Sequence, residues 1–342
     1  MSDFYPIEVT YLVTNACNAK CKHCYLNAGQ PLPNELTLEY IKKLFSDLYD
    51  AGTINVEFSG GEPLLRQNFI EMMKTAQSAD LTISICSNGL LIDKKMAETF
   101  KDIGVKHVQI SIDGLEANND FLRGKGAFEA AVNAVKYLKE AEVKTYVRTT
   151  VTQKTLYELD QLVNLAIDLN ADLYGAKLFH AVGRGIGYKE DLMLNSDDMQ
   201  KFKNIIRRIS EIYSDKIHIL SDNPGFFESS KSHGLSEDEM RTFTCQGGRS
   251  WCVIMPNGVV TPCDIIPFYA GNIRKEKFSE IWEKAAVFKT FREFDPNSLK
   301  GVCGGCEYRN ICGGHCHALA LLFNGDFFGS DPTCWRVSKA VL

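Results

Sequence analysis

Long apolar runs, an excess of either charge and low-complexity stretches are all missing from this chain of 342 residues. No apolar run approaches the roughly 20 residues that span a bilayer, and no charged leader precedes an apolar stretch. The net charge of -5 gives no support to wholesale binding of nucleic acid or of an anionic membrane. We therefore predict a cytoplasmic protein with no nucleic-acid or membrane partner, which acts on small molecules or on another protein.

Cysteine is the residue type present in unusual number. The chain has 12 cysteines, and a reducing cytosol disfavours structural disulfides while it permits clustered thiolates for metals or redox work. Free cysteine can also pack as a small apolar residue, but all except one of these fall into clusters along the sequence. Metal binding is therefore the first interpretation.

The first half of the chain alternates short β-rich runs with segments of helical period, which is typical of βα units around a parallel sheet. Six strands are predicted at Ile7–Thr14, Ile54–Phe58, Leu81–Cys86, His107–Ile112, Thr145–Val151 and Leu173–Phe179. Helices are predicted at Leu38–Ala51, Phe128–Glu140, Leu156–Leu169 and about Asp197–Tyr213. The expected fold is α/β, a partial (β/α)6 barrel whose chemistry gathers at the C-terminal strand ends.

The remainder of the chain differs in composition. Residues 221–244 are polar and contain Pro224, Gly225 and Gly234, which suits a linker or lid. Eight cysteines follow within 90 residues, a density that indicates a separate module supported by metal. We expect a core domain at 1–220, a linker at 221–244 and a cysteine-rich domain at 245–342.

The run CNAKCKHC places Cys17, Cys21 and Cys24 in the loop after the first strand. A [4Fe–4S] cluster normally takes one thiolate for each of its four irons, so three thiolates leave one iron able to bind another ligand. Closely spaced cysteines also hold tetrahedral zinc, for which His23 is the nearest fourth ligand. The three-and-two spacing favours the iron–sulfur interpretation.

These residues give the chain a specific resemblance to the radical SAM (S-adenosylmethionine) superfamily. The family's signature is CxxxCxxC after the first strand, and FSGGEP at Phe58–Pro63 resembles its GGE motif after the second. The resemblance implies that SAM binds the open iron and is reductively cleaved to methionine and a 5′-deoxyadenosyl radical. That radical abstracts hydrogen from the substrate, and a flavodoxin- or ferredoxin-like protein supplies the electron.

The same resemblance implies contacts to SAM. Gly60, Gly61 and Glu62 would meet the methionine amino group, while Ser87, Asn88, Ser111 and Asp113 would reach the ribose and methionine. Arg148 would pair with the SAM carboxylate, a role for which Arg123 competes, and His23 would pack near the adenine. Short polar residues at strand ends are also ordinary turn formers, so position rather than residue type carries this assignment.

The C-terminal cysteines resemble the SPASM domain, which binds two auxiliary [4Fe–4S] clusters. By this resemblance, one cluster would be held by Cys245, Cys252, Cys263 and Cys316, and the other by Cys303, Cys306, Cys312 and Cys334. The chain would then carry three clusters in all. A double zinc ribbon with His315 and His317 is the alternative. Cys86, inside a predicted strand, is expected to pack in the core.

Asp264 directly follows Cys263 and is the candidate catalytic residue. In sulfatase maturases of this family an aspartate at the matching point is proposed to accept the substrate's proton, and a carboxylate here is able to do the same. An ordinary turn residue or a hydrogen-bond partner of the cluster loop is an equally good interpretation.

The function expected first is modification of a ribosomally made peptide: a thioether or carbon–carbon cross-link, an oxidative decarboxylation or an epimerisation. Because the core begins near Ile7, a separate leader-binding carrier protein would present the peptide. The alternatives are a haem-pathway enzyme that oxidatively decarboxylates tetrapyrrole side chains, and a sulfatase-maturase-like oxidation of Cys or Ser. An iron–sulfur electron carrier is a fourth possibility, but it needs neither an open iron nor a GGE motif.

Overall fold

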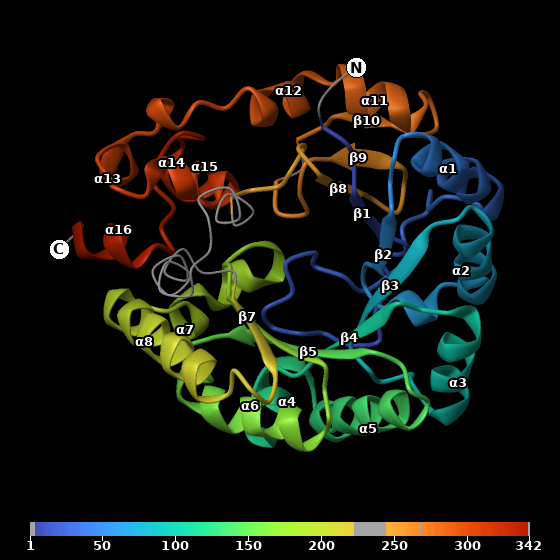
Figure 1. Ribbon diagram of the computed structural model, residues 1–342, viewed down its shortest axis with the longest axis horizontal. Helices are drawn as coiled ribbons and strands as arrows, with labels where there is room; N and C mark the ends of the chain where they lie inside the picture. The colour runs from blue at the N-terminus through green and yellow to red at the C-terminus, as the bar shows by residue number, and fades with distance from the viewer. Residues whose placement is uncertain (1–3, 222–243, 267, 341–342) are drawn as a thin grey trace.

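A single curved sheet with helices on its outer side forms the body of the protein (Figure 1). The computed structural model describes residues 4–221, 244–266 and 268–340. Within them the sheet has ten strands, in the order β10-β9-β8-β1-β2-β3-β4-β5-β6-β7. The first seven strands of the chain pair in parallel: β1 Glu8–Leu12, β2 Asn55–Ser59, β3 Thr82–Ser87, β4 His107–Ser111, β5 Thr145–Val151, β6 Leu173–Leu178 and β7 His218–Ser221.

The six predicted strands are confirmed to within two residues at each end, and the α/β partial-barrel class with them. The strand β7 was not predicted, because it is only four residues long and alternates between exposed and buried positions without an apolar run. It pairs with β6 and so extends the parallel part of the sheet.

Helices connect successive strands and cover their outer face, and all four predicted helical segments are present. The segment predicted at Leu156–Leu169 is divided between a short 3-10 turn, η2 (Leu156–Glu158), and α6. The helices of this half are α1 Leu38–Asp50, α2 Phe69–Ser78, α3 Lys94–Ile103, α4 Glu116–Arg123, α5 Ala127–Glu140, α6 Leu159–Asp168, α7 Lys189–Leu192 and α8 Ser196–Ile212. None of the helices in the described ranges has the length and apolarity to cross a membrane.

The strands of the C-terminal segment extend the sheet of the βα half. Strand β8 (Trp251–Ile254) pairs in parallel with β1, and β9 (Val259–Thr261) and β10 (Gly271–Asn272) continue antiparallel. Short helices then complete the chain: α11 Phe278–Lys284, α12 Ala286–Arg292, α13 Gly301–Gly304, α14 Arg309–Cys312, α15 His317–Asn324 and α16 Trp335–Ala340. The expected linker falls almost wholly on residues 222–243, outside the described residues.

Alternation along the strands separates an apolar face from a polar one. On β1, Val9 and Tyr11 are fully buried against the helices, whereas Glu8 and Thr10 face a central cavity. Phe58 on β2 packs edge-on against aromatic rings of α1 and α2. The helices thus bury one face of the sheet, and the other face is left to line the cavity.

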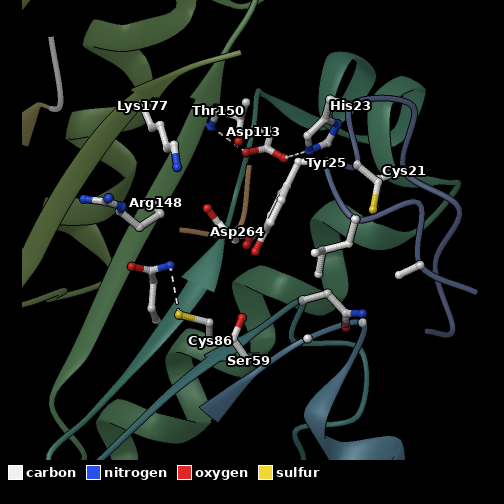
Figure 2. Close-up of a pocket in the computed structure, with 18 of the residues that line it drawn as sticks. Cys21, His23, Tyr25, Ser59, Cys86, Asp113, Arg148, Thr150, Lys177 and Asp264 are labelled. Carbon is white, nitrogen blue, oxygen red and sulfur yellow. Dashed lines mark hydrogen bonds and ion pairs between the residues drawn. The ribbon is translucent and has the colours of Figure 1, made fainter. Parts of the chain in front are cut away.

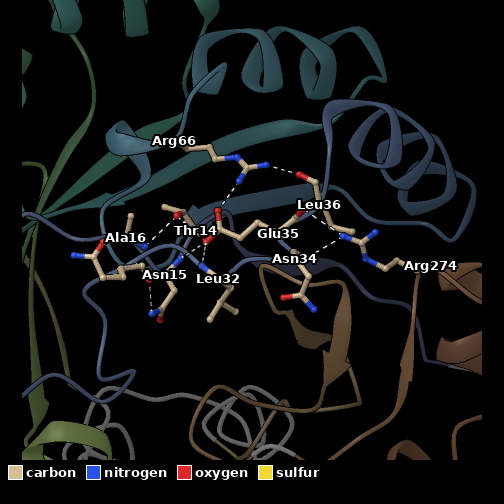
Figure 3. Close-up of polar contacts among 10 residues, drawn as sticks. Thr14, Asn15, Ala16, Leu32, Asn34, Glu35, Leu36, Arg66 and Arg274 are labelled. Carbon is tan, nitrogen blue, oxygen red and sulfur yellow. Dashed lines mark hydrogen bonds and ion pairs between the residues drawn. The ribbon is translucent and has the colours of Figure 1, made fainter.

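A buried carboxylate fixes the point where β1 gives way to the loop that carries Cys17 (Figure 3). Glu35 accepts hydrogen bonds from the Thr14 hydroxyl at 2.9 Å and from the backbone N–H groups of Asn15 and Leu32 at 2.8 and 3.0 Å. Its second oxygen pairs with the Arg66 guanidinium at 2.5 Å, and the Glu35 side chain is only 7% exposed. One side chain therefore satisfies donors from both ends of the loop.

Removing this acceptor should destabilise the protein. Glu35→Ala leaves the Arg66 guanidinium unpaired in a mostly buried place, and we expect the free energy of unfolding to fall by about 3 kcal/mol. The control Glu39→Ala removes an acid whose pair with Lys43 is exposed to solvent, and should change it by less than about 0.5 kcal/mol. Chemical denaturation measures both variants. Equal effects would contradict the role given to Glu35.

Candidate functional site

A cavity of about 410 Å³ lies on the inner face of the sheet, toward the C-terminal ends of its strands (Figure 2). It brings together nearly all the residues that the sequence singled out in the first half of the chain. Those lining it are Cys17, Cys21, His23, Cys24, Gly60, Gly61, Ser87, Asn88, Ser111, Asp113, Arg123, Arg148 and, from the C-terminal segment, Asp264. Glu62 lies fully buried directly behind this wall.

The two glycines after β2 let this strand end lie directly against the loop that carries Cys17. The Gly61 N–H donates to the Thr14 carbonyl at 2.8 Å, and the next N–H, that of Glu62, donates to the Ala16 carbonyl at 2.8 Å. A Cβ atom at Gly60 would lie 2.5 Å from the Thr14 oxygen, and one at Gly61 would lie 2.1 Å from the Ala16 oxygen. Only glycine permits this approach of one backbone to another.

The Glu62 side chain links the ends of β2 and β3 from behind the cavity wall. It accepts from the Ser87 hydroxyl at 2.9 Å, from the Asn88 N–H at 2.9 Å and from the Leu64 N–H at 3.3 Å. Burial raises the pKa of Glu62 to about 7, although these three donors oppose the shift. The Asn88 amide in turn reaches the Asn18 side chain at 2.8 Å, beside Cys17. A carboxylate is thus held ready beside the cluster loop.

The thiols of Cys17, Cys21 and Cys24 come from one loop and lie within electrostatic reach of one another. Burial raises the pKa of Cys17 and of Cys21, and neighbouring thiols add to both shifts. Among the residues that the structure describes, no three His, Cys, Asp or Glu side chains converge on the position of a single metal ion. The three thiols instead border the large cavity, which suits a cluster with one thiolate on each of three irons.

Asp113 at the end of β4 forms a buried network with two residues that the sequence treated separately. One oxygen pairs with His23 Nε2 at 2.8 Å and with Arg123 Nε at 2.5 Å, and the other accepts from the Thr150 N–H at 2.7 Å. Burial by itself would raise the pKa of Asp113, but Arg123 and His23 hold it well below the usual range. Asp113 therefore binds both His23 and Arg123 in this structure, and the three side chains hold one another in place.

An arginine that the sequence analysis missed fastens the far end of the cluster loop. The Arg184 guanidinium donates to the carbonyls of Cys21, at 2.9 Å, and Ala28, and its backbone N–H donates to the Cys24 carbonyl at 2.9 Å. Gly183 before it has φ +57°, and a Cβ there would lie 2.2 Å from the Tyr25 oxygen. Because Arg184 binds backbone carbonyl oxygens, no sequence motif marks it as a residue of the site.

Two cations line the cavity, and Lys177 extends toward Asp264 whereas the Arg148 guanidinium turns away from it (Figure 2). Arg148 on β5 and Lys177 on β6 lie on adjacent strands, where Arg148 is in register with Gly175. A Cβ at Gly175 would lie 2.2 Å from the Arg148 side chain, so this glycine makes room for it. The expectation that Cys86 packs in the core is wrong: its thiol lines this cavity and accepts from Gln109 Nε2 at 3.3 Å.

Asp264 faces the same cavity from the C-terminal segment, toward the Tyr25 ring (Figure 2). Burial raises the pKa of Tyr25 well above its usual value, and the Asp264 carboxylate, which accepts a hydrogen bond from the Tyr25 hydroxyl, raises it further. Tyr25 follows Cys24, so this contact joins the first cluster loop to the loop of Cys263.

The remaining cysteines fall into unequal groups. Cys303, Cys306, Cys312 and Cys334 all line one small cavity of about 30 Å³. Cys245, Cys263 and Cys316 lie within electrostatic reach of one another. Cys252, which the resemblance placed in this second group, is instead a fully buried residue of β8. Four thiols around one cavity fit a [4Fe–4S] cluster, and the first loop fits one that binds a further ligand.

Comparison with known proteins follows the same division of the chain. The Radical SAM superfamily model matches residues 11–166, and the SPASM model, an iron-sulfur cluster-binding domain, matches residues 245–307. An AdoMet-dependent heme synthase of Methanosarcina barkeri is 33% identical over 96% of this chain and 96% of its own. A mycofactocin maturase of Mycolicibacterium smegmatis is 30% identical over 96% of this chain and 82% of its own.

Among solved structures, Streptococcus suis SuiB bound to its precursor peptide SuiA shares the fold. The TM-score is 0.78 over 96% of this chain and 76% of that one, at 19% sequence identity. At this identity the likeness concerns the fold alone.

The role of Arg184 can be tested through iron retention. Arg184→Ala removes two donors to carbonyls of the cluster loop, so we expect the reconstituted protein to lose up to about four irons per chain, the content of one cluster. Arg208→Ala is the control, because Arg208 pairs with Asp160 on the exposed helical surface. Iron and acid-labile sulfide assays provide the measurement. Full retention in Arg184→Ala would show that the loop holds its shape without this side chain.

Proposed function

The chain belongs to the radical SAM superfamily and carries a C-terminal SPASM domain, and from this premise we propose that it oxidatively decarboxylates propionate side chains of a tetrapyrrole. It is an enzyme of the oxidoreductase or maturase class that binds SAM and iron–sulfur clusters. The observation that carries the tetrapyrrole proposal is the 33% identity to a heme synthase across 96% of both chains. Peptide modification, which the sequence placed first, becomes the second candidate.

The cavity offers groups suited to an acidic substrate. Lys177 extends from β6 into the space between Arg148 and Asp264 (Figure 2), where a cation would bind a propionate carboxylate. We assign Lys177 to the substrate carboxylate and keep Arg148 as the partner of the SAM carboxylate. Glu62, Ser87, Asn88 and the two glycines would hold the methionine end of SAM beside Cys17.

When bound, a cluster on Cys17, Cys21 and Cys24 together with SAM would supply a 5′-deoxyadenosyl radical. One hydrogen atom leaves the propionate carbon next to the ring and appears in 5′-deoxyadenosine. The bond to the carboxylate then breaks, which releases CO2 and one electron and leaves a vinyl group. Two auxiliary clusters on the C-terminal cysteines, making three in the chain, would accept that electron, while a flavodoxin- or ferredoxin-like protein would reduce the first cluster.

Peptide maturation is the second candidate because a mycofactocin maturase is also related over most of both chains. In that case a separate leader-binding carrier would bring the peptide, and Asp264 would accept a proton from it. The two candidates share the SAM chemistry and differ in what fills the cavity around Lys177.

The tetrapyrrole proposal predicts a defined product. Anaerobic reconstituted enzyme with SAM, a strong reductant and iron coproporphyrin should form 5′-deoxyadenosine and a vinyl product that has lost CO2, measured by mass spectrometry. Replacing Cys17, Cys21 and Cys24 with Ala should abolish both. Lys177→Gln should raise the KM for the tetrapyrrole about tenfold, the value of one charge-assisted hydrogen bond, and leave SAM cleavage without substrate unchanged. An unmodified tetrapyrrole alongside a modified peptide would favour the second candidate.

The raised pKa of Glu62 predicts a pH-dependent affinity for SAM. The carboxylate form attracts the ammonium group of SAM, so affinity should fall as the pH drops through about 7. Equilibrium dialysis of labelled SAM between about pH 6 and 8 measures this. Glu62→Gln should bind SAM more weakly and without this pH dependence, whereas Glu57→Gln, which removes another acid of the cavity, should keep it. A flat wild-type profile would contradict the assignment of Glu62.

A further inference from the structure

Lysine side chains lie on aromatic rings at the surface beside the loop that carries the first three cysteines. The Lys22 ammonium group, in this loop, lies 4.9 Å from the centre of the Phe121 ring on α4 and 5.5 Å from that of Tyr188. Lys154 lies over the same Phe121 ring, also at 4.9 Å. Phe121 is 42% exposed, and Lys154 is exposed as well. These four residues therefore form one group that solvent can reach.

A fifth residue, Lys189, extends the group along the chain. It follows Tyr188, the last residue of the 3-10 helix η3 (Gly183–Tyr188), and its ammonium group lies 5.3 Å from the ring of Phe323 on α15. Tyr188 and Phe323 pack against one small apolar cluster, formed by Leu122, Phe179, Ala181 and Leu192. We call the five residues the lysine–aromatic surface: Lys22, Phe121, Lys154, Tyr188 and Lys189.

The ammonium groups of this surface are available to a binding partner. None of the ion pairs among the described residues includes Lys22, Lys154 or Lys189. A ring contact orders a lysine without neutralising it, because the ring face attracts a cation but carries no net charge. Two exposed acids, Glu190 and Asp191, follow Lys189 on α7 and reduce the net positive charge at that end.

The molecule as a whole carries the opposite charge. The chain has 43 acidic and 38 basic residues, a net charge of -5, yet it has no Asp or Glu between Glu8 and Glu35, where Lys20 and Lys22 lie. An acidic protein is therefore repelled by the molecule as a whole and attracted at this surface. Such complementarity steers diffusional encounter and selects the partner more than it adds affinity.

The elements that carry this surface also hold the cluster loop. The Lys22 N–H donates to the Leu122 carbonyl at 2.9 Å, one residue beyond Phe121. Helix η3 contributes Arg184, whose guanidinium donates to the Cys21 carbonyl at 2.9 Å. A protein docked on the surface would thus contact the segment that contains Cys21 itself. Because electron transfer requires two redox groups to approach closely, this is a favourable place from which to reduce a cluster on that loop.

We propose that the lysine–aromatic surface docks an acidic electron-transfer protein, with a flavin or an iron–sulfur cluster, that delivers the electron for SAM cleavage. The inference rests on the proposed function only in requiring that a cluster on Cys17, Cys21 and Cys24 is reduced. In the step, the partner is oxidised by one electron and that cluster is reduced by one, and no bond forms or breaks. The lysines pair with carboxylates of the partner, and the exposed ring of Phe121 adds apolar contact, as aromatic residues do in protein interfaces.

The first test compares two electron sources for the same full-length, anaerobically reconstituted enzyme. Formation of 5′-deoxyadenosine from SAM is measured without tetrapyrrole, with either dithionite or a reduced acidic flavodoxin as the reductant. In the double variant Lys154→Glu, Lys189→Glu, we expect the flavodoxin-driven rate at low flavodoxin concentration to fall about tenfold, because electrostatic attraction is lost. The dithionite-driven rate should stay at the wild-type value, since a small reductant needs no docking surface.

The double variant Lys74→Glu, Lys95→Glu is the matched control. These lysines are exposed on α2 and α3, away from α7 (Figure 1), and their replacement changes the net charge by the same amount. The control should keep the wild-type ratio of flavodoxin-driven to dithionite-driven rates, and this ratio compares each variant with itself even where its cluster content differs. A wild-type ratio in Lys154→Glu, Lys189→Glu, or an equal loss in the control, would overturn the inference.

Cross-linking locates the docked partner independently of activity. A carbodiimide joins a lysine to a carboxylate with which it forms an ion pair, and mass spectrometry identifies the lysine. With the flavodoxin we expect cross-links at Lys22, Lys154 or Lys189, and their loss in high salt, which screens exposed charges. Cross-links confined to other lysines would overturn the inference, whereas a tetrapyrrole left unmodified by the enzyme would count only against the proposed function.

Discussion

The loop that carries Cys17, Cys21 and Cys24 has almost no regular structure, so its shape has to be imposed from outside, and the site depends on this constraint. Glu35 fixes its beginning, and Gly60 and Gly61 lie against it with no side chain between the backbones. Arg184 holds the carbonyls of its far end. Thiolates on a loop reach defined irons only if the loop is rigid. The contacts from these three parts of the chain therefore have to form before the loop can hold a cluster.

Much of the fold could be predicted because the βα half of the chain repeats a strong local pattern. The strands place apolar residues on their helix-covered face, and helices such as α1 alternate apolar and polar residues with a clear period. The strand-end residues of the site followed from the family resemblance, and topology explains why they meet, since the C-terminal ends of parallel strands lie at one edge. Nearly all of the named residues line the cavity, but many of its other lining residues, Tyr25 and Lys177 among them, were not named from the sequence.

The rest of the fold and of the site depends on contacts that produce no periodic pattern in the sequence. Strands β7 and β8 have four residues each, and the pairing of β8 with β1 joins residues more than 240 positions apart. Cys86 was placed in the core because its strand was recognised but the inward direction of its side chain was not. Cys252 was grouped with its neighbours in sequence, whereas strand alternation turns it the other way. Arg184 donates hydrogen bonds to backbone carbonyl oxygens. Every residue carries such an oxygen, so no sequence pattern marks the partners of Arg184.

The parallel pairing of β8 with β1 also has a consequence for the order in which the chain is built. During synthesis the first strand is made at once, but its outer neighbour follows only after residue 250. Until then one edge of β1, in the strand that leads into the SAM-cluster loop, offers unpaired N–H and C=O groups to any other extended chain. The nascent chain therefore carries an uncovered strand edge until its own C-terminal segment is made, and such an edge exposes a folding chain to aggregation.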